Sequence, residues 1–335
     1  MAFAITQSCT TATNASKDYS INGKAFKEAY NSISADDLKR DLYIVASDEM
    51  EGRDTGSKGQ KKAGEYIVSQ YKKMGLEFPK VLGSYYQAVP SSALKTRRGE
   101  LPASENILGY IEGSEKPNEL IVISAHYDHV GTKNGEVYNG ADDDGSGTVA
   151  LLELAEAFLK AKKAGIGPKR SILFLHVTGE EHGLLGSEYY SNNPVFPLAN
   201  TVANLNIDMI GRSDEENKGK DYVYVIGSEM LSSQLKVINE TANKNTHNLI
   251  LDYKYDDPKD PMRLYYRSDH YNFAKHNIPV AFFFNGVHED YHKPSDTPDK
   301  IDYILMHKRA QLIFTTAWEL ANRAERIVVD GKNTR

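Results

Sequence analysis

From residue 119 onward, the chain alternates between nearly continuous apolar segments and segments with helical spacing. The segments of strand character are 119–125, 170–178, 201–210, 221–227 and 278–284, and those of helical character are 146–163, 183–193, 230–244 and 303–327. Strands that are apolar throughout belong to a sheet buried on both faces, and their alternation with helices favours parallel pairing. We therefore predict an α/β fold: a three-layer α/β/α sandwich with a mixed, mostly parallel central sheet.

The N-terminal third has a different pattern. Apolar residues recur at spacings of three and four within 26–47 and 57–76, which predicts amphipathic helices, with a loop over 48–57 between them. Strand-like pieces at 84–90 and 106–113 predict paired edge strands. Because no repeat or strong linker interrupts the chain, we expect one domain over 21–330, preceded by a tether over 1–20.

Composition excludes several classes of function. The 335 residues are 40% hydrophobic and 26% charged, with a net charge of −6 and a pI near 6.0, as in an ordinary globular protein. No long basic stretch suggests nucleic acid or anionic lipid as a partner. No apolar run approaches the ~20 residues that a transmembrane helix needs. The single cysteine, Cys9, excludes an intrachain disulfide.

The first 20 residues combine a short apolar start, Cys9 and a tether rich in Ser, Thr and Asn. This composition fits the trimmed end of an export or lipoprotein signal, and it fits a disordered chain end equally well. The first alternative predicts an exported protein (periplasmic, extracellular or lipoprotein), with a lipid anchor at Cys9.

Three consecutive aspartates, Asp142 to Asp144, run directly into the apolar helical segment that follows them. Adjacent carboxylates at the edge of a core take up protons unless a cation or hydrogen-bond donors compensate their charge. Asp144 or Ser146 could cap the helix, but one cap needs only one residue. A bound metal would explain the remainder.

Metal-binding side chains follow four of the predicted strands, at the sheet edge where open α/β folds place their ligands. They are His126, Asp128 and His129, then Glu180 and Glu181, then Asp208, and finally His288, Glu289 and His292. Zinc accepts imidazole and carboxylate together, whereas an all-oxygen magnesium or calcium site would not need the histidines. The sequence therefore predicts a zinc site at this edge.

The string HEDYH, 288–292, matches the zincin pattern H-E-x-x-H, in which one helical face carries both histidines. Asn285-Gly286 stands just upstream and Pro294 just downstream. These residues disfavour a helix, so we interpret the match as a coincidence in a loop.

From EGRDTGSKGQ to the last helix, the chain resembles the dizinc aminopeptidases of the co-catalytic zinc exopeptidase family, which also contains glutamate carboxypeptidase and the one-zinc glutaminyl cyclases. The motifs AHYDHVG, GADDDGSG, GEEHGLLGS, NIDMIGR, YRSDH and YHKPSDT occur in the order that this family has them. The resemblance implies a zinc-dependent aminopeptidase that acts on peptides and holds two Zn²⁺ per chain.

Matching positions imply individual roles. By resemblance, His126 and Asp208 bind one zinc, Glu181 and His292 bind the other, and Asp143 bridges them. The general base falls on Glu180, the carboxylate that orients His126 falls on Asp128, and the oxyanion donor falls on Tyr291. Capping or loop hydrogen bonds are expected for Asp142 and Asp144, and structural roles for His129, His182, His270 and His288.

Chemistry agrees with this division of roles. Neighbouring residues of an extended chain point opposite ways, so one of Glu180 and Glu181 is expected to be a ligand and the other a base. Two ligands and a bridge at each metal leave room for a shared water, which two cations acidify and Glu180 can deprotonate.

Three other functions remain open at this stage. A one-zinc glutaminyl cyclase would differ in its metal count, and a non-catalytic receptor would lack a ligand or the base. A carboxypeptidase would need a cationic clamp for a free carboxylate, for which Arg267 is the main candidate and Arg212 the second. The acidic site favours recognition of an α-amine by Glu180 and Asp208, hence an aminopeptidase.

Overall fold

The computed structural model describes residues 17–257 and 259–331. Cys9 and most of the predicted tether lie outside the described residues, so the export signal and the lipid anchor stay predictions. Tyr19 is partly buried against the main core, and its carbonyl accepts a hydrogen bond from Trp318 Nε1 at 2.8 Å. Among the described residues, no helix is both long and apolar enough to cross a membrane.

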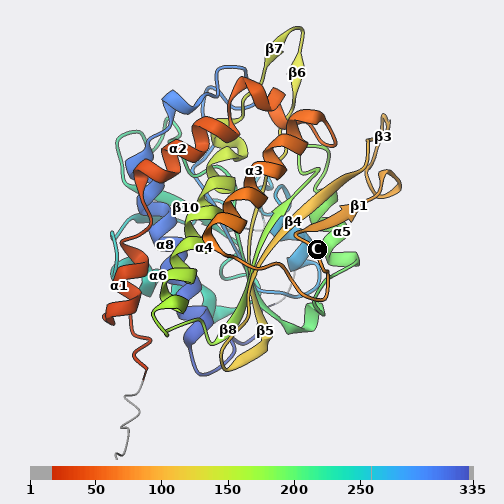
Figure 1. Cartoon of the computed structure of the whole chain (residues 1–335). Coiled ribbons are helices and arrows are strands. Elements are labelled where there is room, and N and C mark those ends of the chain that lie inside the picture. The colour runs from red at the N-terminus through yellow and green to blue at the C-terminus, as the bar shows by residue number, and fades with distance from the viewer. Residues whose placement is uncertain (1–16, 258, 332–335) are drawn as a thin grey trace, which may run out of the picture.

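An eight-stranded mixed sheet forms the centre of the molecule (Figure 1), in the order β1-β4-β8-β5-β9-β12-β10-β11. The neighbours β8, β5, β9 and β12 run parallel to one another, and β10 pairs in parallel with β11. The pairs β1–β4, β4–β8 and β10–β12 are antiparallel. The strands are β1 (Tyr86–Val89), β4 (Ser104–Ile111), β5 (Lys116–His126), β8 (Arg170–Val177), β9 (Thr201–Ile207), β10 (Tyr222–Ile226), β11 (Ile250–Asp252) and β12 (Val280–Phe284).

Helices cover the two faces of the sheet unequally. Six of them, gathered on one side in Figure 1, pack on one another, and α4 and α8 contact the central strands directly. Two short helices, α5 and α7, contact each other and the sheet, in the second core. The thick layer holds α1 (Lys24–Tyr30), α2 (Ala35–Val45), α3 (Lys58–Met74), α4 (Gly147–Lys163), α6 (Ser233–Lys244) and α8 (Tyr303–Asn322), and the thin layer holds α5 (Leu185–Asn192) and α7 (His270–Ala274).

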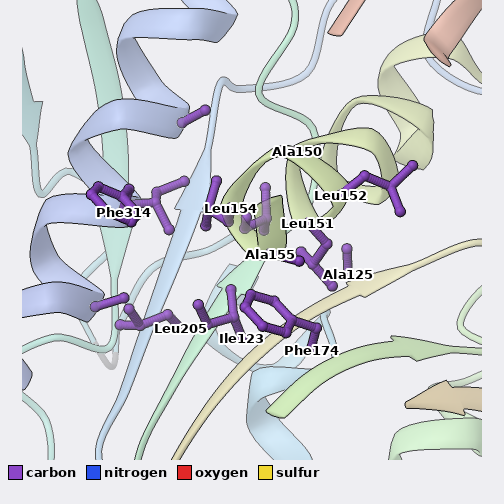
Figure 2. Packing of buried hydrophobic residues seen from close by; sticks show 14 of the residues in the cluster. Ile123, Ala125, Ala150, Leu151, Leu152, Leu154, Ala155, Phe174, Leu205 and Phe314 are labelled. Carbon is purple, nitrogen blue, oxygen red and sulfur yellow. The ribbon is translucent and has the colours of Figure 1, made fainter. Parts of the chain in front are cut away.

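The alternation of side chains along each strand supplies two separate cores. In β5, Ile121 and Ile123 belong to the larger core with α4 and α8, whereas Leu120 and Val122 belong to the smaller core with α5 and α7. Figure 2 shows α4 laying Ala150, Leu151, Leu154 and Ala155 over Ile123, Phe174 and Leu205 of the sheet, with Phe314 of α8 beside them. The predicted three-layer α/β/α sandwich with a mixed sheet is confirmed.

Some predicted elements differ in detail. The segment 26–47 forms two helices because the chain breaks at Asn31, and Ser34 then caps α2 by accepting a hydrogen bond from Asp37 N at 3.3 Å. The last helix ends at Asn322 because Arg323 adopts extended backbone angles. The predicted loop 48–57 contains a 3₁₀ segment, Asp48–Arg53. Short hairpins that were not predicted join β2 (Lys95–Thr96) to β3 (Gly99–Glu100) and β6 (Thr132–Lys133) to β7 (Glu136–Val137).

Candidate metal centre and active site

Parallel pairing of the four central strands brings their carboxyl ends to one edge of the sheet. β5 ends at His126, and β9 is followed at once by Asp208. Glu180 and Glu181 come three and four residues after the end of β8, and His292 lies in the loop that follows β12. The topology therefore gathers the predicted ligands at the place where α/β sheets hold their ligands.

The three aspartates turn in separate directions at the start of α4. Asp144 accepts hydrogen bonds from three backbone N–H groups, at distances of 2.9 to 3.2 Å. Asp142 accepts one from Gly211 N at 2.6 Å. These two carboxylates thus fasten loops, as expected, and Asp143 is the one of the three that contacts both His126 and His292.

Asp143 stands between two histidines from different strand ends. Its Oδ1 lies 3.2 Å from His126 Nε2, which is 3.6 Å from Asp208 Oδ1. Its Oδ2 lies 2.9 Å from His292 Nε2, which is 3.1 Å from Glu181 Oε2. One carboxylate therefore offers one oxygen to each of two donor groups, which is the arrangement that a bridging ligand requires.

The side-chain nitrogen and oxygen atoms of this centre are better placed to bind a metal than to hydrogen-bond with one another. Asp143 Oδ2 and Glu181 Oε1 are fully buried and form no hydrogen bond within the part of the chain that the structure describes. Two sets of ligand atoms, each mutually within 4.8 Å, could hold an ion: His126 with Asp144 and Asp208, and His129 with Asp143 and Glu181. Asp144 is occupied by its backbone donors, so Asp143 is the better ligand. Imidazole and carboxylate donors together suit zinc.

Charge within the site separates the carboxylates. Burial and the neighbouring Asp143 both raise the pKa of Glu181. His129 and His292 outweigh these two effects and lower that pKa to about 2. The pKa of Asp143 is likewise held well below its usual range by His126 and His292 against the effect of burial. Burial raises the pKa of Glu180 well above its usual range. A carboxyl group with a raised pKa is suited to take up and return a proton.

Asp128 makes a different contact from the one implied by resemblance. His126 Nδ1 faces the main-chain oxygen of Asp128 at 3.0 Å, and the Asp128 carboxylate is 3.8 Å away. That carboxylate accepts hydrogen bonds from Thr55 Oγ1 at 2.9 Å and from Glu180 N at 3.2 Å. Its carbonyl thus fixes the imidazole, and its carboxylate holds the backbone of Glu180.

The remaining predicted residues line a small pocket of about 40 Å³ beside Asp143. Tyr291 stacks on His292 with ring centroids 3.9 Å apart, and it lines the pocket together with Glu180 and Asp208. Arg267 lines the same pocket with an exposed side chain. The apolar part of the wall consists of Met209, Leu264, Phe282, Phe284 and Val287. By contrast, Arg212 is paired with Asp290 at 3.0 Å, which makes it a structural arginine.

The HEDYH string lies in a turn-rich loop, as predicted. His288 Nε2 faces Asp142 Oδ2 at 3.1 Å, whereas His292 faces Asp143 and Glu181, so the two histidines do not converge. Glu289 is exposed.

Several supporting residues escaped the sequence argument. Ser268 Oγ donates to Asp208 Oδ2 at 2.6 Å, and Asp296 accepts hydrogen bonds from the backbone of Asp142 and Asp143 at 3.0 to 3.2 Å. Both belong to motifs that the resemblance had already marked, YRSDH and YHKPSDT. His129, expected to be structural, places Nδ1 2.7 Å from Glu181 Oε1 inside the centre. The direction of its side chain depends on the loop after β5, which strand periodicity does not specify.

Comparison with known proteins decides the family. The profile of Peptidase family M28 matches residues 106–317, more than half of the chain. This chain belongs to peptidase family M28. The predicted assignment to the zinc exopeptidases and to the hydrolases is thereby confirmed.

Similar proteins carry related names. A protein of Arthroderma otae named probable leucine aminopeptidase is 27% identical over 286 residues, which is 78% of this chain and 74% of that protein. The solved structure of BSAP, a zinc aminopeptidase from Bacillus subtilis, superposes with a TM-score of 0.66 at 18% identity, over 90% of this chain and 99% of BSAP. Glutaminyl cyclase from Porphyromonas gingivalis has a TM-score of 0.66 at 20% identity, over 85% and 97%. At these identities the two structures show a shared fold.

Proposed function

We propose that this M28 peptidase is a zinc-dependent aminopeptidase that removes N-terminal residues from peptides and holds two zinc ions per chain. The observation that carries the proposal is the position of Asp143, whose two carboxylate oxygens face His126 and His292 separately. A centre for one ion would not need two sets of ligands joined by one carboxylate.

The proposed ligand sets follow from these contacts. His126 and Asp208 would hold one zinc, Glu181 and His292 the other, and Asp143 both. When bound, the ions supply Lewis acidity, which makes a water nucleophilic at neutral pH and polarises the scissile carbonyl.

The chain's own residues perform the remaining steps. Glu180 borders the small pocket beside Asp143 and has a raised pKa, so it would accept a proton from the attacking water and pass it to the leaving amine. Tyr291, on the same wall, would donate its hydroxyl hydrogen to the developing oxyanion. The backbone bond from Glu180 N to Asp128 keeps the base in position.

The shape of the small pocket supports recognition of a peptide N-terminus. The carboxylates of Glu180 and Asp208 line it, and they would neutralise a protonated α-amine. Apart from Asp143, Tyr291 and Arg267, the rest of the wall is apolar, and the pocket's small volume of about 40 Å³ favours the end of a chain over a continuing peptide.

A panel of aminoacyl and peptidyl p-nitroanilides, assayed together with zinc content, tests this proposal. We expect hydrolysis of aminoacyl substrates with apolar side chains, and two zinc ions per chain. One zinc per chain together with cyclisation of N-terminal glutamine would favour the glutaminyl cyclase alternative.

A further inference from the structure

A second, larger hollow opens on the other side of the metal centre. It has a volume of about 660 Å³, and the proposed zinc ligands Glu181 and His292 form part of its wall. The small pocket instead borders Glu180 and Asp208, and the two hollows share no lining residue. The centre therefore stands between a small pocket with apolar walls and an open groove.

Two hairpins that project from the body of the molecule (Figure 1) contribute cations to this groove. Arg97 and Arg98 are the two residues between β2 and β3, so the tip of that hairpin consists of two guanidinium side chains. Lys133, from the β6–β7 hairpin, also lines the groove.

The arginines at the hairpin tip are not neutralised locally. Both are exposed, and within the described ranges no carboxylate forms an ion pair with either. The acidic residue of the groove outside the metal centre, Asp54, lies 2.9 Å from His182 Nε2. Three cations thus face one open groove on a chain whose net charge is −6.

Contacts within each hairpin fix the turn that carries these cations. The salt bridge between Lys95 and Glu100, 3.4 Å long, ties the two strands of the first hairpin together. Its tight turn is closed by Thr96 Oγ1, which accepts from Arg98 N and donates to Gly99 O at 3.0 Å each. The second hairpin turns at Asn134-Gly135, where both residues have positive φ, and Lys133 Nζ lies 5.0 Å from the centroid of the Tyr138 ring.

We propose that this groove binds the part of the substrate that follows the scissile bond, and that Arg97, Arg98 and Lys133 select leaving peptides that carry carboxylates. The inference rests on the proposed aminopeptidase function, which places the first residue in the small pocket. The following residues then leave past Glu181 and His292 into the groove. Acidic side chains or the free C-terminus of a short peptide would meet the cations there.

Five substrates test the selection: the C-terminally amidated tetrapeptides Leu-Gly-Glu-Glu, Leu-Gly-Lys-Lys and Leu-Gly-Gln-Gln, the non-amidated Leu-Gly-Gln-Gln, and leucine p-nitroanilide. We expect kcat/KM for the acidic peptide to exceed that for the basic peptide about tenfold at low salt, and 0.5 M NaCl to remove most of the difference. Comparing Leu-Gly-Gln-Gln with its amide separates the contribution of the terminal carboxylate from that of acidic side chains.

The variant Arg97→Glu/Arg98→Glu is expected to abolish or invert the preference and to hydrolyse leucine p-nitroanilide at the wild-type rate, because the short, uncharged leaving group of that substrate offers the arginines no carboxylate. The matched control is Lys160→Glu/Lys162→Glu, which makes the same change in net charge. These lysines are exposed in the last turn of α4, roughly 20 Å along the helix from the aspartates. Adding Lys133→Glu to the first variant should extend the effect.

A preference that survives Arg97→Glu/Arg98→Glu, or one that the control changes equally, would overturn the groove proposal. Failure of the wild-type protein to hydrolyse leucine p-nitroanilide would count against the aminopeptidase function instead. Calorimetric binding of the acidic and basic peptides to Glu180→Gln enzyme tests the groove without turnover. Equal affinities there would also reject it.

Discussion

At the scale of single residues, Asp143 is the carboxylate that joins the two halves of the centre. Its oxygens lie 3.2 Å from His126 Nε2 and 2.9 Å from His292 Nε2. We predict that Asp143→Asn loses both of the proposed zinc ions together during dialysis, because a neutral amide cannot balance two dications. Metal analysis of the dialysed protein measures this loss. Retention of one tightly held ion would show that Asp143 serves a single site.

Glu180 lies beside the same centre and holds its loop through the backbone: its N–H donates to Asp128, and its main-chain oxygen accepts from Gly183 N and Leu184 N. We expect Glu180→Gln to retain both metals and the wild-type melting temperature while kcat falls by ~10² to 10⁴-fold, because only proton transfer is removed. Assays with leucine p-nitroanilide, metal analysis and thermal unfolding measure these three quantities.

Glu289→Gln is the matched control, since it makes the same chemical change at an exposed carboxylate of the HEDYH loop. Its activity should equal that of the wild type. If Glu289→Gln were inactive and Glu180→Gln active, the base would belong to the zincin string.

The residue types that gather in the site could be predicted from the sequence, whereas the directions of their side chains largely could not. Strand ends determine which residue types gather at an edge, so His126, Glu181 and Asp208 could be anticipated together. Loop conformation decides where a side chain points, and the pattern does not encode it. For this reason the contact of His129 with Glu181, and the use of the Asp128 carbonyl in place of its carboxylate, emerge only in the structure.

At the scale of elements, burial explains which predictions succeeded. The bounds of the central strands and of α4 were predicted closely, because these elements are packed on both sides and their sequences are correspondingly apolar. The hairpins at 95–100 and 132–137 are short and largely exposed, so no periodicity marks them. These same hairpins carry the cations of the groove, which made that feature inaccessible to the sequence argument.

The contact between α2 and α4 contains a buried acid that links stability to pH. Glu153 of α4 accepts a hydrogen bond from Ser34 N at 2.8 Å, and burial raises its pKa to about 8. Between its usual pKa, near 4.5, and 8, the folded chain keeps a proton that the unfolded chain releases. The stabilising contribution is therefore complete below pH 4.5 and is lost as the pH rises through 8, by up to about 1.4 kcal/mol per pH unit.

We predict that Glu153→Gln removes this pH dependence and is more stable than the wild type above pH 8, since an amide fills the site without a charge. Urea unfolding from pH 5 to 9 measures the free energy of unfolding of both proteins. The control is Glu156→Gln, an exposed position on the same helix. Parallel pH profiles for the wild type and Glu153→Gln would mean that the buried carboxyl is ionised throughout.

At the scale of the whole molecule, the metal centre at the sheet edge has two unequal hollows beside it. Its carboxyl edge holds the metal centre, with the small pocket by Asp208 on one side and the open groove by His292 on the other. Under the proposed function, this asymmetry would give a bound peptide a direction: the end that enters the small pocket would be the terminus that is recognised. Carboxylates there favour an amine, whereas Arg267, exposed at the same pocket, could receive a carboxylate.

Blocking one terminus of a good peptide substrate at a time decides between these two directions. We predict that acetylation of the N-terminus abolishes cleavage, because it removes the charge that Glu180 and Asp208 would neutralise and adds bulk to a pocket of about 40 Å³. Amidation of the C-terminus should leave the bond that is cut unchanged and lower kcat/KM only for short peptides whose carboxylate reaches the groove. Mass spectrometry of the products identifies the residue released. Cleavage that survives acetylation and stops on amidation would reverse the direction and assign Arg267 to a carboxypeptidase site.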